Sequence, residues 1–247
     1  MTMPTSISRE SFDEAQAITA EIWQSASSAE IMFTMLLESR LFQNSNRYTP
    51  HFYMFAASCA RRVNHLLQDP RSHEAIRAAE LFATKATSRK QLLESHLSAH
   101  SAALDLATTY NNSPLATTDQ LNHDDRLLPS RRTFFGGALM HAAATASIAC
   151  CPSELLHPLR AAETSARYAT TALYYEQLSH DTDSTLISQL IEEEQHRQSQ
   201  ALRIFLGNPF ASKRWPAFTI APQSLELTKP TLNKVARFTT TPRPITH

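Results

Sequence analysis

The residues best suited to metal chemistry are a glutamate and a histidine three positions apart, Glu193 and His196. On a helix this spacing puts a carboxylate and an imidazole on one face, as in ferritin-like di-iron bundles, which need a second such pair and two further glutamates. The sequence shows neither, although His96 and His100 are two more candidate ligands. A metal- or small-ligand-binding bundle, such as a ferritin-like oxidoreductase, is therefore an alternative function. Because only part of a ligand set is present, we expect no cofactor.

Two adjacent arginines, Arg61 and Arg62, follow an apolar run and precede His65. A guanidinium pair of this kind can bind a carboxylate or phosphate in bidentate fashion. It can equally form salt bridges to neighbouring helices, through acids such as Glu74 or Glu80. The second role is the more common one, so we expect the arginines to be structural.

Common catalytic motifs are missing from the sequence, which has no Gly-rich phosphate loop, no G-x-S-x-G and no H-E-x-x-H. Enzymes without a local motif are not excluded by this, so catalysis stays open while the balance is against it. The three cysteines, Cys59, Cys150 and Cys151, fit no zinc-site spacing. Free thiols in an odd number suit a reducing compartment, and we expect a cytoplasmic protein.

An all-α fold is favoured by the scarcity of glycine. The chain has 3 glycines in 247 residues, where average usage would give about 17. Good helix formers such as Ala, Leu, Gln, Glu and Arg replace them. Residues 133–151 carry no charge, but they are Ala, Thr, Ser and Gly rather than Leu, Ile and Val, so we expect a buried helix and no membrane span.

Caps, prolines and apolar periodicity predict a multi-helix bundle over residues 1–207. The polar segment 111–129 divides this body into two halves, and Gly207-Asn208-Pro209 is a strong stop signal at its end. The predicted helices are 11–23, 29–42, 51–68, 72–85, 88–110, 130–151, 158–178 and 183–206. The Phe134-Phe135-Gly136-Gly137 segment predicts a close-packing point between helices.

Residues 208–247 form a basic, Pro-punctuated segment that predicts an extended C-terminal arm. It holds six basic residues and one acid, a net charge of +5, which leaves −5 for residues 1–207 because the whole chain is neutral. Apolar and cationic side chains alternate along it, as a strap across a partner would require. The residues expected to contact a partner are Phe210, Lys213, Arg214, Trp215, Phe218, Lys234, Arg237 and Phe238.

Two segments have a distinctive sequence: residues 54–67 read MFAASCARRVNHLL, and residues 203–210 read RIFLGNPF. They resemble the motifs F-A-C-x-C-C-R-R-x-W-x-L-L and R-D-I-F-G-N-P-F of a group of uncharacterised planctomycete-type helical proteins. The chain departs from the group at Ala57 and Ala60, which replace cysteines, and at Asn64, which replaces tryptophan. The group has no established activity, so the resemblance implies no reaction. It implies structural roles for the shared positions Arg61, Arg62, Gly207, Asn208 and Pro209.

The interpretation that best fits these features is a non-enzymatic helical subunit that works through protein contacts. Its C-terminal arm would strap a protein partner or a neighbouring copy of the chain. A nucleic-acid-binding arm is a further alternative, in which Trp215 and Phe238 would stack on bases. The arm's net charge of +5 is small for that role, which argues against a nucleic-acid partner.

Overall fold

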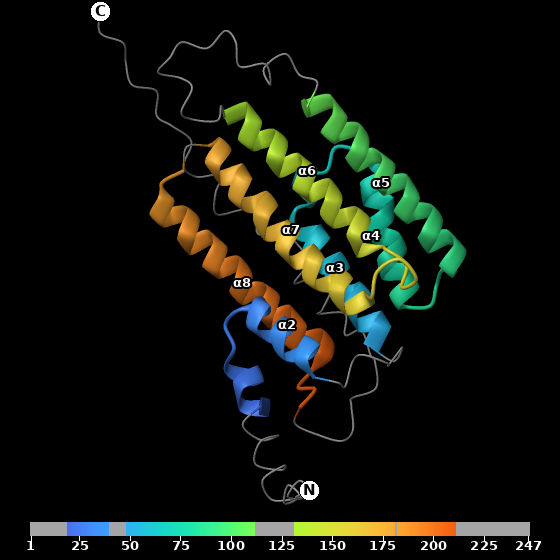
Figure 1. Ribbon diagram of the computed structural model, residues 1–247, viewed down its shortest axis with the longest axis vertical. Coiled ribbons are helices and arrows are strands. Elements are labelled where there is room, and N and C mark those ends of the chain that lie inside the picture. Colours follow the sequence, from blue (N-terminus) through green and yellow to red (C-terminus); the bar gives the residue numbers. More distant parts are fainter. Residues whose placement is uncertain (1–18, 40–47, 112–130, 181, 211–247) are drawn as a thin grey trace, which may run out of the picture.

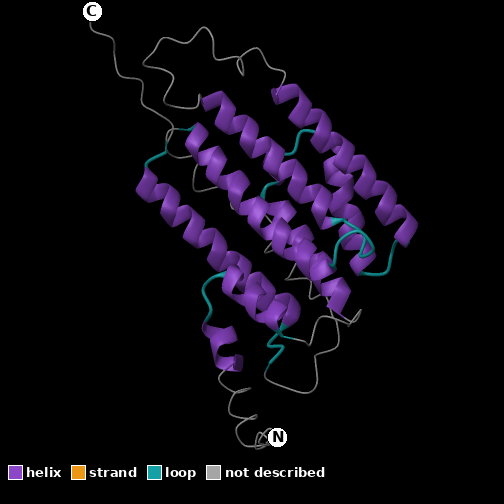
Figure 2. Cartoon of the chain, in the orientation of Figure 1, coloured by secondary structure: helices purple, strands orange, loops and turns teal. Residues whose placement is uncertain are grey.

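The structure, a computed structural model of the chain, describes residues 19–39, 48–111, 131–180 and 182–210. In these residues every regular element is a helix, which confirms the all-α prediction (Figures 1 and 2). Residues 19–25 are helical, and the further helices are α2 (Ala29–Glu38), α3 (Thr49–Arg62), α4 (Pro70–Ala83), α5 (Arg89–Asn111), α6 (Arg131–Ala149), α7 (Pro158–Ser179) and α8 (Ser184–Leu206), with a 3-10 turn η2 (Asn64–Leu66) after α3.

Parts of the predicted organisation lie outside the described residues, namely the arm beyond residue 210 and almost all of the polar loop at 111–129. Within the described residues, no helix is long and apolar enough to cross a membrane. The uncharged stretch 133–151 forms most of α6 and packs among other helices.

The helices form two layers (Figure 1). Helices α8, α7, α6 and α5 lie side by side in one layer, each in contact with the next, and α3 and α4 lie behind them, while α2 packs against α7 and α8. Helix α3 contacts α4, α6, α7 and α8 and is the centre of the fold. All ten residues from 51 to 60 are buried. Because ten residues make more than two helical turns, this part of α3 is covered on every side.

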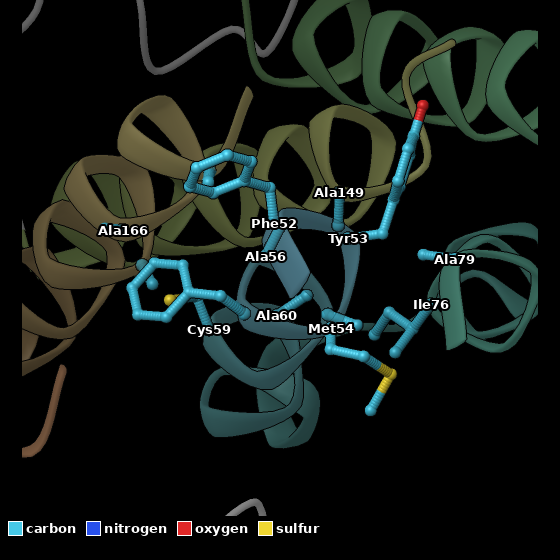
Figure 3. Packing of buried hydrophobic residues seen from close by; sticks show 14 of the residues in the cluster. Phe52, Tyr53, Met54, Ala56, Cys59, Ala60, Ile76, Ala79, Ala149 and Ala166 are labelled. Atoms are coloured by element: carbon cyan, nitrogen blue, oxygen red, sulfur yellow. The ribbon is translucent and has the colours of Figure 1, made fainter. Parts of the chain in front are cut away.

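The side chains of α3 point in different directions into the neighbouring helices (Figure 3). Met54 lies beside Ile76 of α4, and Cys59 lies toward Ala166 of α7. Tyr53 reaches past Ala149, and its hydroxyl donates to the carbonyl of Cys151 at 2.8 Å. A helix that is enclosed in this way needs apolar or small residues all around its axis, which is what the sequence of α3 supplies.

Small side chains allow α6 and α7 to lie close together. Buried alanines recur at three- and four-residue intervals along both helices, at Ala138, Ala142, Ala146 and Ala149 of α6 and at Ala162, Ala166, Ala169 and Ala172 of α7. At the start of α6, a Cβ on Gly136 would lie 2.4 Å from the ring of Tyr110, and one on Gly137 would lie 3.3 Å from the ring of Tyr175. The predicted close-packing point is therefore present.

Side chains cap the starts of α4 and α5, and α4 begins at Pro70, two residues before the predicted start at 72. Asp69 accepts a hydrogen bond from the backbone N–H of Arg71 at 2.8 Å, with Pro70 as the first helical residue of α4. The spacing of Ser88 and Gln91 in the sequence is that of a capping box, and the two residues form one at the start of α5. Oγ of Ser88 accepts from the N–H of Gln91 at 3.2 Å, and Oε1 of Gln91 accepts from the N–H of Ser88 at 3.0 Å.

Two predicted helices are too long. The helix expected over 29–42 ends at Glu38, because Ser39 is extended. The helix expected over 51–68 ends at Arg62, because Val63 leaves the helical region at φ −103° and ψ 15° and a 3-10 turn follows. Asp69 is extended because a proline comes next, and this separates the turn from α4.

The end of α8 holds the N-terminal helical residues 19–25 against the body. Trp23 is fully buried, and its indole N–H donates to the carbonyl of Gly207 at 2.8 Å. Its ring contacts the ring of Phe210 edge to face, with the centroids 5.7 Å apart. Gly207 makes this contact possible by ending α8 with φ 63° and ψ −144°, a conformation that residues with a side chain rarely adopt.

Two side chains of the same region complete this attachment. The guanidinium of Arg203 donates to the carbonyl oxygens of Trp23, at 3.2 Å, and Ala26. The amide of Asn208 donates to the carbonyl of Ala20 at 3.0 Å. Carbonyl groups at the end of a helix have no partner within the helix, so Arg203 caps the N-terminal segment. We call the residues Arg203, Gly207, Asn208 and Phe210 the clasp.

Replacing Gly207 with alanine is expected to lower the free energy of unfolding by about 2 kcal/mol, because the backbone conformation there is strained for any side chain. Urea unfolding followed by circular dichroism measures the change. Ser188→Ala, an exposed substitution on the same helix, is the control and is expected to stay within about 0.5 kcal/mol of the parent. If the Gly207→Ala chain were as stable as the parent, the clasp would not require this backbone conformation at residue 207.

Candidate interaction surface

Glu193 and His196, the predicted half of a di-iron site, both lie on the exposed face of α8. Glu193 forms an ion pair with Arg197 one turn further along the helix. The Nε2 atom of His196 lies 2.8 Å from the amide nitrogen of Gln200. No three His, Cys, Asp or Glu side chains come together as a metal site anywhere in the described residues. The ferritin-like alternative therefore gains no support from this geometry.

His96 and His100 lie on successive turns of α5, with stacked rings whose centroids are 6.0 Å apart. His96 is buried, and its Nδ1 lies 3.0 Å from the backbone carbonyl of Ser147 in α6. A carbonyl only accepts hydrogen bonds, so Nδ1 carries the proton. His96 thereby joins α5 to α6, while His100 faces outward. In the described residues, neither histidine forms a metal-ligand cluster with Glu193 or His196.

The two arginines at the end of α3 are both paired with glutamates of other helices. Arg61 donates from Nε and Nη2 to the two carboxylate oxygens of Glu80 in α4, at 2.9 and 2.8 Å. Arg62 binds Glu194 of α8 in the same bidentate way, with Nε 2.7 Å from each carboxylate oxygen. The structure thus places both arginines in inter-helix salt bridges.

The pair of Arg62 and Glu194 belongs to a buried polar network that joins three helices. The side chain of Glu194 is 2% exposed and that of Arg62 15% exposed. The amide nitrogen of Gln198, one turn along α8, lies 2.9 Å from Oε1 of Glu194 and 3.1 Å from the carbonyl of Ala166 in α7. Since each ionised group is desolvated and has its partner, removing either one would leave a buried charge without compensation.

Sequence reasoning missed Glu194 and Gln198, because the run Glu192-Glu193-Glu194 looks like a solvated helix face. The periodicity of apolar residues along α8 could have predicted that both side chains are buried. Ile187, Glu194, Gln198, Leu202 and Leu206 follow one another at intervals of seven and four residues and form the buried stripe of the helix.

The three cysteines are all buried and free. Burial raises the pKa of the Cys59 thiol far above its ordinary value, and the nearby Glu194 carboxylate raises it further. Burial also raises the pKa of Cys150 strongly and that of Cys151 to about 11. The thiolate is the nucleophilic form, so these cysteines are unreactive near neutral pH.

The surface feature that stands apart is the outer face of α5. Helix α5 is at the edge of its layer and packs against α4 and α6 (Figure 1). On its other side, Leu93, Leu97 and Leu104 are 38%, 55% and 55% exposed. Their spacing of four and seven residues keeps them within about 40° of one another around the helix axis. We call this row the leucine stripe.

The leucine stripe has the spacing of a coiled-coil seam, with His100 between its second and third leucine. Most other large exposed apolar residues in the described part of the chain are single side chains on separate elements, such as Leu155, which is 60% exposed. Isolated apolar residues are normal on a protein surface and do not indicate a binding site. Three leucines in line along one edge helix present a seam that a second helix could cover.

Comparison with models of protein families, with curated protein sequences and with solved structures finds no match for this chain. The resemblance of its two motifs to the planctomycete-type group therefore stays a hypothesis.

Replacing Arg62 with methionine is expected to lower the free energy of unfolding by about 3–5 kcal/mol, because Glu194 then stays buried without its partner. The double variant Arg62→Met/Glu194→Leu is expected to recover most of this loss, since no buried charge is left. Urea unfolding of the two single variants and the double variant gives the coupling energy.

Arg61→Met is the matched control, because Arg61 is 34% exposed and its partner Glu80 22% exposed. Water screens this pair, so the loss is expected to be about 1 kcal/mol or less. Equal losses at the two arginines, or no recovery in the double variant, would contradict the role that we assign to the buried network.

Proposed function

We propose that this chain is a helical protein-interaction subunit whose leucine stripe packs against a helix of a protein partner, with a second copy of the chain as the first partner to test. The observation that carries the proposal is the row of exposed leucines along α5. Its support comes from the spacing of the leucines and from the position of α5 at the edge of the bundle.

The energetics of the leucine stripe call for additional contacts. Full burial of a leucine contributes about 1.5–3 kcal/mol. Covering the half that is still exposed would contribute about 1 kcal/mol for each leucine, or about 6 kcal/mol for two stripes facing each other. The loss of free motion on association costs at least about 4 kcal/mol. The stripe can fix the register of an interface, but a stable complex needs further buried surface.

We propose that the C-terminal arm supplies this surface. The arm residues that would contact the partner lie outside the described residues and are Lys213, Arg214, Trp215, Phe218, Lys234, Arg237 and Phe238. Phe210 is no longer among them, because it is 6% exposed and packs on Trp23 in the body of the molecule. The clasp therefore fixes the point from which the arm starts.

Helix contact through the leucine stripe is tested with the double variant Leu97→Glu/Leu104→Glu. The charges are expected to prevent self-association measured by sedimentation velocity, while the helical spectrum and melting temperature stay unchanged because both positions already face solvent. Leu155→Glu introduces a charge at an equally exposed leucine elsewhere and is expected to keep the assembly. A parent chain that stays monomeric at high micromolar concentration would exclude the second copy as the partner.

The strap is tested by ending the chain after Ser212, which removes all seven of the arm residues that would contact the partner. Because Phe210 and the clasp remain, this shortened chain is expected to keep its helical spectrum and melting temperature and to lose assembly in light scattering. A chain ending after Gly207 lacks the Trp23–Phe210 contact as well, and its melting temperature is expected to fall by several degrees. Full assembly without residues 213–247 would refute the strap.

A further inference from the structure

A cavity of about 290 Å³ lies among η2, the start of α4, and helices α5 and α6. Its apolar lining includes Leu66, Leu106 and Leu139, and its polar lining includes Asp69, Ser72 and Asp105. Pockets for drug-sized ligands start at about 300 Å³. The volume therefore suits a small molecule and is too small for a nucleotide or a large coenzyme.

The wall of the cavity contains a buried hydroxyl without a partner. Ser72 is 1% exposed, and its Oγ makes no hydrogen bond in the described structure. A serine inside a helix usually bonds to the carbonyl four residues earlier. Ser72 stands in the first turn of α4, and the residue four positions before it lies outside the helix. A buried hydroxyl without a partner costs about 1–3 kcal/mol, so this wall is suited to a ligand that offers a hydrogen bond.

The rim of the cavity is acidic. Arg71 joins the two rim carboxylates, with Nη2 at 2.7 Å from Asp69 and at 2.8 Å from Asp105. Hydrogen bonds from Arg71 hold the pKa of Asp69 below its ordinary value, so Asp69 is ionised and engaged. Asp105, which is 64% exposed, keeps an oxygen that Arg71 does not bind. Two carboxylates and one guanidinium leave one negative charge at the rim.

An anion does not fit this site, although it lies at a helix N-terminus. The backbone N–H groups of Arg71 and Ser72 already donate to the side chain and the carbonyl of Asp69. They are therefore not free to bind a phosphate or carboxylate, and the rim charge would repel one. A cation with an apolar body matches both the leucine floor and the rim.

We propose that this cavity binds a small aliphatic amine that carries a second hydrogen-bonding group. The ammonium pairs with Asp105 at the rim. The carbon chain covers Leu66, Leu106 and Leu139. The hydroxyl of Ser72 is enclosed in the free protein, so it turns into the cavity by rotation about the Cα–Cβ bond and there bonds to the second group. The ligand class is that of short amino alcohols and diamines.

Isothermal titration calorimetry of the full chain with three probes tests each contact. The probe 5-aminopentan-1-ol carries both groups, pentylamine lacks the hydroxyl, and pentane-1,5-diol lacks the charge. The amino alcohol is expected to bind most tightly. Asp105→Asn is expected to weaken it about threefold, as for other exposed ion pairs, and to remove its advantage over the diol.

Two further variants change binding in opposite directions. Ser72→Ala is expected to remove the advantage of the amino alcohol over pentylamine, while it raises the melting temperature of the free protein because a buried unpaired hydroxyl is gone. Arg71→Gln is expected to tighten binding, because it frees Asp105 for the ammonium. Glu74→Gln, the same type of charge change at an exposed position on α4 outside the cavity, is the control and is expected to have no effect.

Blocking the cavity locates the site. Ala143→Leu places a larger side chain into the cavity from α6, and Thr109→Leu does so from its exposed edge, where a folding defect is not expected. Both are expected to abolish binding. The proposal would be overturned if the diol bound as tightly as the amino alcohol, or if either blocked variant bound the amino alcohol as the parent does. It would also be overturned if Nα-acetyl-lysine methylamide, which mimics a lysine side chain of a peptide, bound more tightly than 5-aminopentan-1-ol.

Discussion

The enclosure of α3 is the constraint on which the rest of the structure depends. Ten consecutive buried residues require neighbours on every side, and α4, α6, α7 and α8 all contact this helix. A helix with no solvated face cannot carry charge along its length, so the charged side chains of α3 lie at its end. Arg61 and Arg62 stand in the last turn, where cations interact favourably with the helix dipole.

The end of α3 also determines how the surrounding helices are joined. Arg61 connects it to α4 through Glu80, and Arg62 connects it to α8 through Glu194. One turn later, His65 lies 3.0 Å from Glu176 of α7. A short segment of chain thus contacts carboxylates of three neighbouring helices, and the two arginine contacts are ion pairs. Ion pairs of this kind add little net stability compared with apolar packing, but each is specific for one partner and favours a single arrangement of the helices.

The sequence predicted those elements of the fold that depend on local chemistry. The capping box of Ser88 and Gln91 and the glycine that ends α8 each act within a few residues, so their effects could be derived without knowing the fold. The length of α3 could not, because it ends where Val63 packs into the core rather than at a breaker residue.

The candidate sites were harder to predict because exposure depends on packing. Glu193 and Glu194 are adjacent and chemically identical, yet one is solvated and the other is buried against Arg62. The same holds for α5, where Leu92 is buried and Leu93 is exposed. Phe210 follows a helix stop signal, so the sequence places it in the arm. It is buried because its ring packs on Trp23, which is far away in the sequence.

Helix α5 links the two proposals, because the leucine stripe and the amine cavity share it. Asp105 lies at the cavity rim and is adjacent in sequence to Leu104 of the stripe. A partner helix that covers Leu104 would also take water from the Asp105 carboxylate, which is costly for an ion without sufficient compensation. Arg71 already divides its guanidinium between Asp105 and Asp69. An ammonium in the cavity would supply the missing charge, so amine binding and partner binding would favour each other, and the linkage would be reciprocal.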